Sequence, residues 1–164
     1  MLQIVIGFCL FISFQACNQN HDSKVEEQVV NLKEFPEGKT IREWEKVLEP
    51  AAYRIMVLGN TELPYLNPYW DNHQKGIYVS AATGKPLFSS DAKFKSGTGW
   101  PSFDKALDDK LIKIVSDRSL GMVRDEVVEA STGLHLGHVF DDGPTSTGKR
   151  YCMNSYALKF IPAK

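Results

Sequence analysis

A short segment near the C-terminus holds the residue types best suited to chemistry. The sequence has three cysteines, and two of them, Cys9 and Cys17, lie in or next to an apolar N-terminal segment. Cys152 is therefore expected to be the only thiol of the folded domain. On a β-strand, alternate side chains project to the same side. Strand geometry would thus place Arg150, Cys152 and Asn154 on one face.

The neighbours of Cys152 bear on whether its thiol reacts. A buried cysteine is more often a small apolar side chain than a nucleophile. With an ordinary pKa of about 8.5, only a small fraction of a thiol is the reactive thiolate at pH 7. Positive charge or a hydrogen-bond donor raises that fraction, and Arg150 and Asn154 can supply both. The pattern favours a nucleophilic Cys152.

Two histidines, His135 and His138, precede the carboxylates Asp141 and Asp142. On a regular strand the two imidazoles would face opposite sides. They can share a site only if Gly137 bends the chain or if the ligand lies at the end of the strand. The pattern by itself is equally consistent with a structural, a metal-binding and an acid–base role.

Residues 95–103 form a glycine-rich loop that ends in aromatic residues. Glycines allow the backbone to approach a ligand closely, but no Lys-Ser or Lys-Thr pair follows the second glycine as it would in a phosphate-binding loop. The spacing therefore argues against a nucleotide site. Trp100 in this loop is either a buried anchor or one wall of a small apolar pocket.

The overall composition is that of a single globular domain. The chain has 164 residues, of which 43% are hydrophobic, enough to bury a core without disulfides. The 19 Lys and Arg residues balance 20 Asp and Glu residues without a basic block. This balance excludes nucleic acid as an expected partner.

Residues 2–14 are almost wholly apolar. This segment is shorter than the roughly 20 residues of a membrane-spanning helix and has the length of a signal-peptide core. Phe14 disfavours ordinary cleavage after Ala16, whereas the sequence up to Cys17 resembles a bacterial lipobox with Cys17 as the lipidated residue. An uncleaved signal anchor is the alternative. We expect a protein exported in a bacterium, anchored by lipid and facing the periplasm or the cell exterior.

The expected division of the chain follows from these patterns. Residues 1–16 are a lipoprotein-like signal peptide, 17–39 a flexible polar tether, and 40–164 the folded domain. The domain begins with a capping box at Thr40 and Glu43 and a short helix that Pro50 ends. Pro50 can itself open a second helix that ends near Gly59.

Short apolar runs separated by turn residues follow the helical patterns. They predict strands over residues 77–81, 111–115, 122–128, 134–140 and 150–161. Because no helical pattern separates consecutive strands, the sequence predicts an antiparallel sheet structure with peripheral helices.

Five segments, in this order, resemble the B-type methionine sulfoxide reductases, which act on the R epimer of the sulfoxide. The segments are 70–78, 86–88, 93–103, 135–140 with 142–144, and 150–162. The similarity extends from about Arg42 to the end of the chain. The resemblance implies a mainly β fold of two antiparallel β-sheets with short N-terminal helices, which agrees with the pattern of elements.

The resemblance also implies a role for individual residues. Cys152 attacks the sulfoxide sulfur and is left as a sulfenic acid when methionine leaves. Trp100 and Phe140 bind substrate, with Trp100 as the wall for the terminal methyl group. The residues implied in binding the oxygen, supplying its proton and tuning the thiol are His135, His138, Asp142, Arg150 and Asn154. Acid groups are needed there because a sulfoxide is a poor electrophile until its oxygen gains a proton.

The sequence departs from many relatives at the positions of a structural zinc. Those relatives bind zinc through two Cys-x-x-Cys pairs, and the matching residues here are Ser80, Thr83, Glu129 and Thr132. No thiolate tetrahedron can form from these four residues. We therefore expect no zinc and no other cofactor, and a region held together by side-chain packing.

A second departure concerns the recycling of the active site. Thr98 stands where some relatives carry a recycling cysteine. The sulfenic acid on Cys152 is therefore expected to need an external thiol, either a thioredoxin-like protein or a small molecule. The other expected partners are oxidised proteins or peptides bearing methionine R-sulfoxide, and a membrane only through the N-terminal lipid.

Two other interpretations use the same residues. In one, a non-catalytic lipoprotein binds oxidised-methionine chains or senses peroxide through Cys152. In the other, the chain is a zinc-free structural module in which Cys152 is buried. The enzyme is favoured over both because every catalytic position implied by the resemblance is occupied by a suitable residue.

Overall fold

The computed structural model describes residue 32 and residues 34–118 and 121–164. The predicted signal peptide, the predicted lipidation site Cys17 and most of the predicted tether lie outside the described residues. Within the described ranges, no helix is both long enough and apolar enough to span a membrane.

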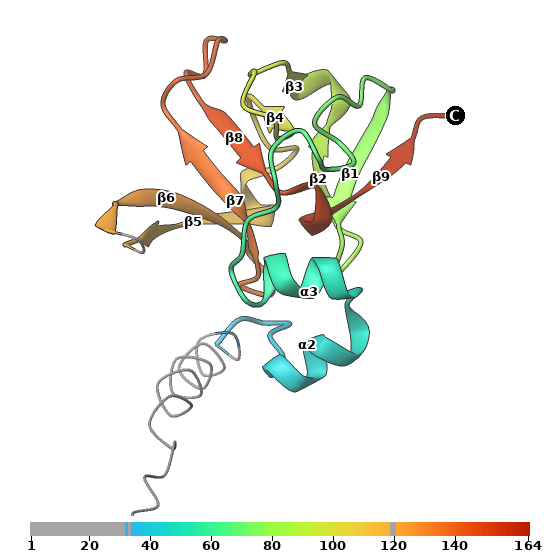
Figure 1. Ribbon diagram of the computed structural model, residues 1–164, viewed down its shortest axis with the longest axis vertical. Coiled ribbons are helices and arrows are strands. Elements are labelled where there is room, and N and C mark those ends of the chain that lie inside the picture. Colours follow the sequence, from blue (N-terminus) through green and yellow to red (C-terminus); the bar gives the residue numbers. More distant parts are fainter. Residues whose placement is uncertain (1–31, 33, 119–120) are drawn as a thin grey trace, which may run out of the picture.

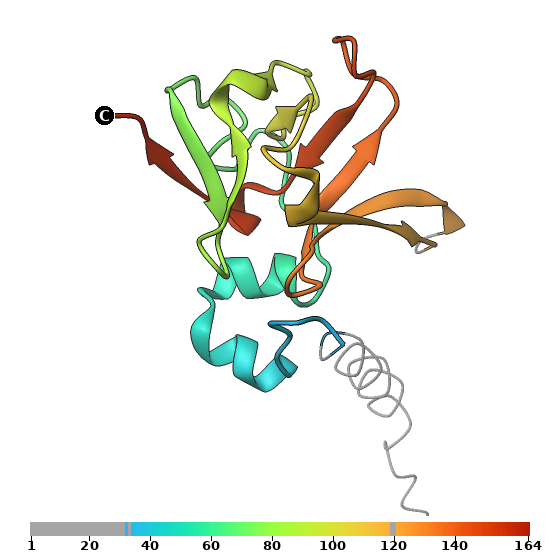
Figure 2. The same ribbon diagram turned by 180° about the vertical axis from the view of Figure 1, so that it is seen from behind.

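Two antiparallel sheets form the described fold, and two short helices pack at one end of them (Figures 1 and 2). The first sheet has the strand order β2-β1-β9 and contains β1 (Gly76–Ser80), β2 (Pro86–Ser89) and β9 (Leu158–Pro162). The second has the order β3-β4-β8-β7-β6-β5 and contains β3 (Lys93–Phe94), β4 (Ser102–Phe103), β5 (Ile112–Asp117), β6 (Arg124–Glu129), β7 (His135–Phe140) and β8 (Arg150–Met153). The predicted mainly β fold is confirmed.

The two helices are α2 (Ile41–Val47) and α3 (Pro50–Met56). The capping box forms as predicted: Thr40 Oγ1 accepts a hydrogen bond from the Glu43 N–H at 3.2 Å, and the Glu43 carboxylate accepts one from the Thr40 N–H at 2.8 Å. Pro50 occupies the first position of α3, where its missing N–H leaves no partner unsatisfied. Gly59, with φ +66°, ends the helical region as the sequence predicts.

Aromatic side chains from both sheets form the centre of the core. The rings of Phe88 and Phe103 stack with centroids 4.5 Å apart, and Tyr78 meets Phe103 edge-on at 5.1 Å. Tyr151 and Met153 on β8 are buried with them. Because side chains alternate along a strand, Cys152 faces away from this core. The catalytic candidate therefore lies on the opposite face of the six-stranded sheet.

The predicted strand over residues 150–161 is wrong in its extent. The chain leaves the six-stranded sheet after Met153, forms the 3₁₀ turn η4 (Ser155–Ala157), and enters the three-stranded sheet as β9. The buried carboxylate of Glu62 accepts hydrogen bonds from the backbone N–H groups of Ser155 at 2.6 Å and Tyr156 at 3.0 Å. These donors are thus satisfied without a strand partner, which allows the break.

Segments too short to give a strand pattern also carry structure. Strands β2, β3 and β4 and the 3₁₀ turn η1 (Ser90–Ala92) lie in regions for which the apolar pattern predicted no strand. The 3₁₀ turn η2 (Asp109–Leu111) ends at Leu111, the first residue of the predicted strand 111–115. Strands β3 and β4 pair over only two residue positions. Their position depends on the neighbouring strand β8 rather than on local preference.

The described end of the predicted tether contacts the domain. The Glu37 N–H donates to the Ser131 carbonyl at 2.7 Å, and the Glu37 carboxylate pairs with Lys85. The Phe35 ring lies against Gly133, where a Cβ atom would come within 2.3 Å of it. The segment before residue 40, which was predicted to be a flexible tether, therefore already contacts the folded domain.

Candidate active site

Cys152 belongs to a row of side chains that crosses the six-stranded sheet. In the register of the antiparallel strands, Cys152 lies opposite Ser102 on β4 and His138 on β7, and His138 lies opposite Glu126 on β6. Residues directly opposite each other project to the same face. A thiol, a hydroxyl, an imidazole and a carboxylate consequently share the face turned away from the core.

The Cys152 side chain borders a cavity of about 140 Å³. Four other predicted site residues border the same cavity: Trp100, His138, Phe140 and Asn154. Thr61 and Arg124, which sequence reasoning missed, complete its polar lining. The cavity therefore combines two aromatic rings with an imidazole, an amide and a guanidinium around one thiol. Three other predicted residues, His135, Asp142 and Arg150, do not border it.

Trp100 is both an anchored loop residue and a cavity wall. Its indole Nε1 donates to the Glu62 carbonyl at 3.2 Å. The preceding residue, Gly99, has φ +86° and accepts a 2.9 Å hydrogen bond from the Tyr65 N–H. A Cβ atom on Gly99 would lie 2.8 Å from that nitrogen, so only glycine fits there. The loop around residues 61–67 thus fixes the indole.

Hydroxyl groups surround the thiol on the side of β4. Thr98 Oγ1 lies 4.0 Å from Cys152 Sγ, and a chain of hydrogen bonds links Thr98, Ser96 and Ser102 at 2.9 and 2.8 Å. Burial raises the pKa of the Cys152 thiol, and this effect exceeds the lowering by the positive charge of Arg150 and by the hydrogen bonds of Thr98 and Ser102. The resting thiol is therefore protonated at neutral pH.

This protonation gives a pH-dependent prediction. Alkylation of Cys152 by iodoacetamide, followed by mass spectrometry of the Cys152 peptide, should be slower at pH 7 than alkylation of glutathione. The rate should increase with pH and reach half of its maximum above about pH 8.5, the ordinary value for a thiol, because the raised pKa shifts thiolate formation upward. A midpoint clearly below pH 8 would contradict the protonated resting thiol.

Arg150 and Asp142 form a pair outside the cavity. The guanidinium meets the carboxylate through two contacts, Nε to Oδ1 at 2.8 Å and NH2 to Oδ2 at 2.9 Å. It also lies over the Phe140 ring, 4.4 Å from the centroid. The hydrogen bond from Arg150 lowers the pKa of Asp142. Asp142 is thus ionised at neutral pH, so in this arrangement it orients Arg150 and has no proton to give.

The two histidines share a face because of a β-bulge. The register between β6 and β7 shifts so that Leu136 is the extra residue. A bulge reverses the alternation of side chains beyond it, and it brings the ring centroids of His135 and His138 to 5.4 Å. The bend needed for a shared site is therefore present, one residue before Gly137.

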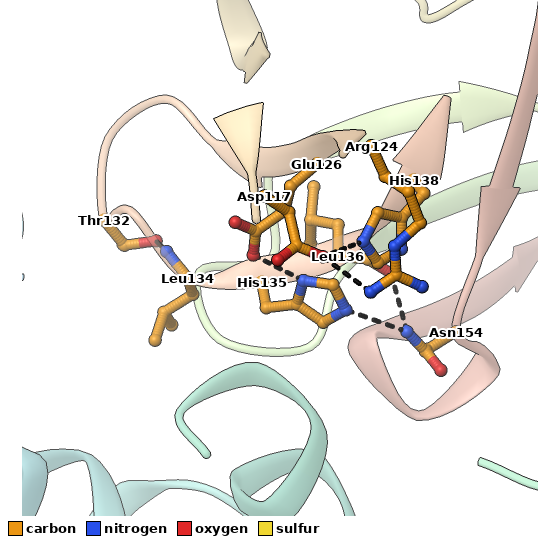
Figure 3. A network of polar contacts seen from close by, with 9 residues as sticks. All are labelled: Asp117, Arg124, Glu126, Thr132, Leu134, His135, Leu136, His138 and Asn154. Atoms are coloured by element: carbon orange, nitrogen blue, oxygen red, sulfur yellow. Dashed lines mark hydrogen bonds and ion pairs between the residues drawn. The ribbon is translucent and has the colours of Figure 1, made fainter. Parts of the chain in front are cut away.

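Each imidazole has its own carboxylate partner (Figure 3). His135 Nδ1 lies 2.6 Å from Glu126 Oε1, and His138 Nε2 lies 2.9 Å from Asp117 Oδ2. Arg124 donates to the same Asp117 oxygen at 2.6 Å. Since a carboxylate only accepts, Nδ1 of His135 and Nε2 of His138 are the donors. The partners come from β5 and β6.

Sequence reasoning missed Asp117, Arg124 and Glu126 as site residues. A signal was present for two of them, since Arg124 and Glu126 are two positions apart in the predicted strand 122–128 and so must share a face. Only the pairing of β6 with β7 shows that this face is the one that carries Cys152 and His138. Asp117, the last residue of β5, pairs directly with Arg124, the first residue of β6.

His135 contacts Asn154 instead of the cavity. The Asn154 side-chain nitrogen donates to His135 Nε2 at 3.3 Å and to the Leu136 carbonyl at 3.2 Å, and its oxygen accepts from the Glu62 N–H at 3.2 Å. His135 is only 6% exposed and borders a separate cavity of about 370 Å³. The geometry makes His135 a support for Asn154.

His138 is the imidazole that faces the thiol. Burial lowers the pKa of His138, and the positive charge of Arg124 adds to this effect, although the hydrogen bond to Asp117 raises the pKa. The imidazole is therefore neutral at pH 7. A neutral His138 beside a protonated Cys152 can relay a proton between the thiol and a bound oxygen without a net change in its own charge.

The four residues that the family resemblance matches to zinc-ligand positions lie together, with the other three around the carboxylate of Glu129. Glu129 is 1% exposed and accepts hydrogen bonds from Ser80 at 2.9 Å, Thr83 at 2.5 Å and Thr132 at 3.0 Å. These bonds join the end of β1 in one sheet to the end of β6 in the other. Three hydroxyl groups and a carboxylate do not match the N and S ligands that zinc prefers. No group of three or more candidate metal ligands occurs within residues 34–118 and 121–164.

Comparison with known proteins places this chain in a family. The SelR domain matches residues 48–162. The peptide methionine sulfoxide reductase MsrB of Thiobacillus denitrificans is 50% identical over 126 residues, which cover 77% of this chain and 96% of that protein. The protein of the same name from Methanosarcina barkeri is 49% identical over 122 residues, which cover 74% of this chain and 86% of that protein. The one from Herminiimonas arsenicoxydans is 48% identical over 122 residues, which cover 74% of this chain and 89% of that protein. The chain therefore belongs to the B-type methionine sulfoxide reductase family.

Proposed function

We propose that Cys152 is the nucleophile with which this reductase converts methionine R-sulfoxide in polypeptides to methionine. The observation that carries the proposal is the small cavity in which Cys152, His138 and Trp100 meet. The relatives named peptide methionine sulfoxide reductase support the same reaction. The indole and phenyl rings offer an apolar surface to the terminal methyl group, and the imidazole side offers hydrogen bonds to the oxygen. The opposite epimer would place its oxygen against an aromatic ring.

The first half-reaction transfers the sulfoxide oxygen to the enzyme. The Cys152 sulfur attacks the sulfoxide sulfur, and the thiol proton passes through His138 to the oxygen. The hydroxyl group then transfers from the substrate sulfur to the Cys152 sulfur: the bond between oxygen and substrate sulfur and the new bond between the two sulfurs break, and Cys152 is left as a sulfenic acid. The substrate sulfur is reduced by two electrons and the cysteine sulfur is oxidised by two. Methionine leaves as an uncharged thioether.

The second half-reaction needs an external thiol. Cys152 is the free cysteine of the described residues, and the side chain of Thr98, which lies next to it, has a hydroxyl group and no thiol. An incoming thiol attacks the sulfenic acid, water leaves, and a mixed disulfide forms on Cys152. A second thiol then releases Cys152 by thiol–disulfide exchange. A thioredoxin-like protein or a small thiol fits this scheme.

The reaction is tested with peptides that carry one defined epimer of methionine sulfoxide, with dithiothreitol as the reductant. The R epimer should be turned over and the S epimer should not. In a single turnover without dithiothreitol, dimedone should label Cys152 once with each equivalent of methionine formed. Equal turnover of both epimers, or methionine formation without labelling, would overturn the proposal.

Replacing Thr98 with cysteine should change how the enzyme is recycled. The introduced thiol would lie within a few ångströms of Cys152, because Thr98 Oγ1 is 4.0 Å from Cys152 Sγ, so it can attack the sulfenic acid directly. After a single turnover, Thr98→Cys should contain a disulfide between the introduced thiol and Cys152 and lose dimedone labelling, as shown by mass spectrometry. Thr98→Ser is the matched control and should keep the label. Equal labelling of both variants would count against the proposed recycling route.

We further propose that the protein works without zinc, with the Glu129 hydrogen bonds in place of metal coordination. The support is the donor set, which lacks thiolates and imidazoles. Metal analysis of the purified full chain should give clearly less than one zinc per protein. A stoichiometric ion that persists after dialysis against a chelator would contradict it.

We also propose export and lipidation, with Cys17 as the acylated N-terminus of the mature protein. The support is the apolar segment of residues 2–14 followed by Ala16 and Cys17. Mass spectrometry of the mature N-terminus after expression in a Gram-negative host should find a diacylglyceryl Cys17. An unmodified N-terminus at another residue would rule this out.

A further inference from the structure

The size of the cavity at Cys152 limits how much of the substrate can enter it. Its volume is about 140 Å³, well below the roughly 300 to 1,000 Å³ of typical small-molecule pockets. A methionine sulfoxide side chain suits this space, but the polypeptide that carries it does not. The residues on either side of the oxidised methionine must therefore lie on the surface next to the cavity.

A second hollow of about 300 Å³ adjoins this cavity. We call it the docking groove and define it by Arg54, Ile55, Thr61, Leu63, Leu66 and Tyr156. Thr61 borders both the cavity and the docking groove. The next residue, Glu62, also borders the groove, and its carbonyl holds the Trp100 indole. The two hollows thus share a wall.

The docking groove exposes leucines on a loop that is held in place. Leu63 is 66% exposed and Leu66 is 74% exposed. The side-chain nitrogen of Asn67, which follows Leu66, donates to the carbonyl of Leu63 at 3.1 Å and to that of Gly99 at 2.7 Å. The loop is fixed by its backbone contacts, so the leucines are not needed to bury it. Adjacent exposed apolar side chains indicate an interaction surface.

Tyr156 extends the same surface from the other side of the groove. It is 38% exposed, and the Glu62 carboxylate holds its backbone N–H at 3.0 Å. The groove is therefore formed before any partner binds. A surface that is already ordered loses little conformational entropy on binding, which favours even small apolar contacts.

We propose that the docking groove binds the residues that flank methionine sulfoxide in an extended polypeptide, with apolar flanking side chains against Leu63 and Leu66. This inference rests on the proposed function, since it assigns the groove to the same reaction. The cavity selects the oxidised side chain, and the groove selects the chain around it. Methionines are mostly buried among apolar residues, so such segments become accessible when an oxidised protein is partly unfolded.

The test compares two substrates. One is N-acetyl-methionine-(R)-sulfoxide methylamide, which has no flanking side chains, and the other is a peptide with leucine on both sides of methionine R-sulfoxide. In the variant Leu63→Ser/Leu66→Ser, kcat/KM for the peptide should fall about tenfold, as expected for two lost leucine contacts. The kcat/KM for the small substrate should stay within about twofold.

A matched control is available in Leu107→Ser. Leu107 is a 46% exposed leucine outside the docking groove, and its replacement should leave both substrates unchanged. If the wild-type protein turned over neither substrate, the proposed function would fail. If the wild-type protein is active but the double variant loses the same factor on both substrates, or on neither, the docking groove is not a substrate site.

Discussion

Replacing Cys152 with serine should lower kcat/KM for methionine R-sulfoxide by at least about 10³-fold, which corresponds to ~4 kcal/mol in activation free energy. A serine hydroxyl ionises far less readily than a thiol and is a poor nucleophile without a strong base. The hydroxyl oxygen also cannot be oxidised by two electrons as the cysteine sulfur is, so no counterpart of the sulfenic acid can form in the variant. Initial rates with dithiothreitol and the R-sulfoxide peptide measure the effect.

The Cys152→Ser variant should keep its fold, because the side chain faces a cavity and the replacement is nearly the same size. Its midpoint of urea unfolding should match that of the wild type. Ser102→Ala is a useful companion: it removes a hydroxyl opposite Cys152 but no nucleophile, and its rate should fall by no more than about tenfold. Unchanged turnover in Cys152→Ser would refute the assignment of the nucleophile.

The wild-type protein and Cys152→Ser also distinguish a reductase from a peroxide sensor. A sensor would form a sulfenic acid on Cys152 with hydrogen peroxide but would release no methionine from an R-sulfoxide peptide. A reductase forms the sulfenic acid with either oxidant and releases methionine in the second case. Dimedone labelling together with methionine release distinguishes the two.

Replacing Glu129 with alanine should cost about 3–5 kcal/mol of unfolding free energy. Glu129 is buried and accepts hydrogen bonds from three hydroxyl groups. Its removal leaves these hydroxyls without their acceptor and leaves a void between the two sheets. Urea unfolding, followed by tryptophan fluorescence, measures the loss. Activity at low temperature should survive, because Glu129 does not border the cavity of Cys152.

Two controls isolate the role of the carboxylate. Glu129→Gln keeps one acceptor oxygen and most of the volume, so it should cost less than the alanine variant, about 1–2 kcal/mol. Glu45→Ala removes an exposed glutamate from α2 and should change the stability by less than about 0.5 kcal/mol. If Glu129→Ala were as stable as Glu45→Ala, the network would not hold the sheets together.

Local patterns were enough for much of this protein. The capping box at Thr40, the helix start at Pro50 and four of the five predicted strands depend on residues close in sequence, and each formed near its predicted position. The alternation that places Arg150 and Cys152 on one face follows from the geometry of any strand. The segments that carry the family resemblance also contain Trp100, His138 and Phe140, which border the cavity with Cys152.

Other features depend on contacts between distant segments. The bulge at Leu136 arises from pairing with β6, and it sets which imidazole faces the thiol. The break after Met153 depends on Glu62, whose carboxylate binds the Ser155 N–H across 93 residues of sequence. Nothing within a few residues of either position specifies these partners.

The segment around Cys152 shows most clearly the difference between what local sequence and what distant contacts determine. Residue types and spacing indicated a thiol beside a guanidinium and an amide, but not how those groups are used. In the folded chain the guanidinium of Arg150 pairs with Asp142 while its positive charge also acts on the thiol, and the amide of Asn154 supports the loop at Glu62. Strand periodicity is local and can be read along the chain. Burial, register and the choice of hydrogen-bond partner are set by packing between sheets, and that packing makes Cys152 a protonated thiol facing His138 and Trp100.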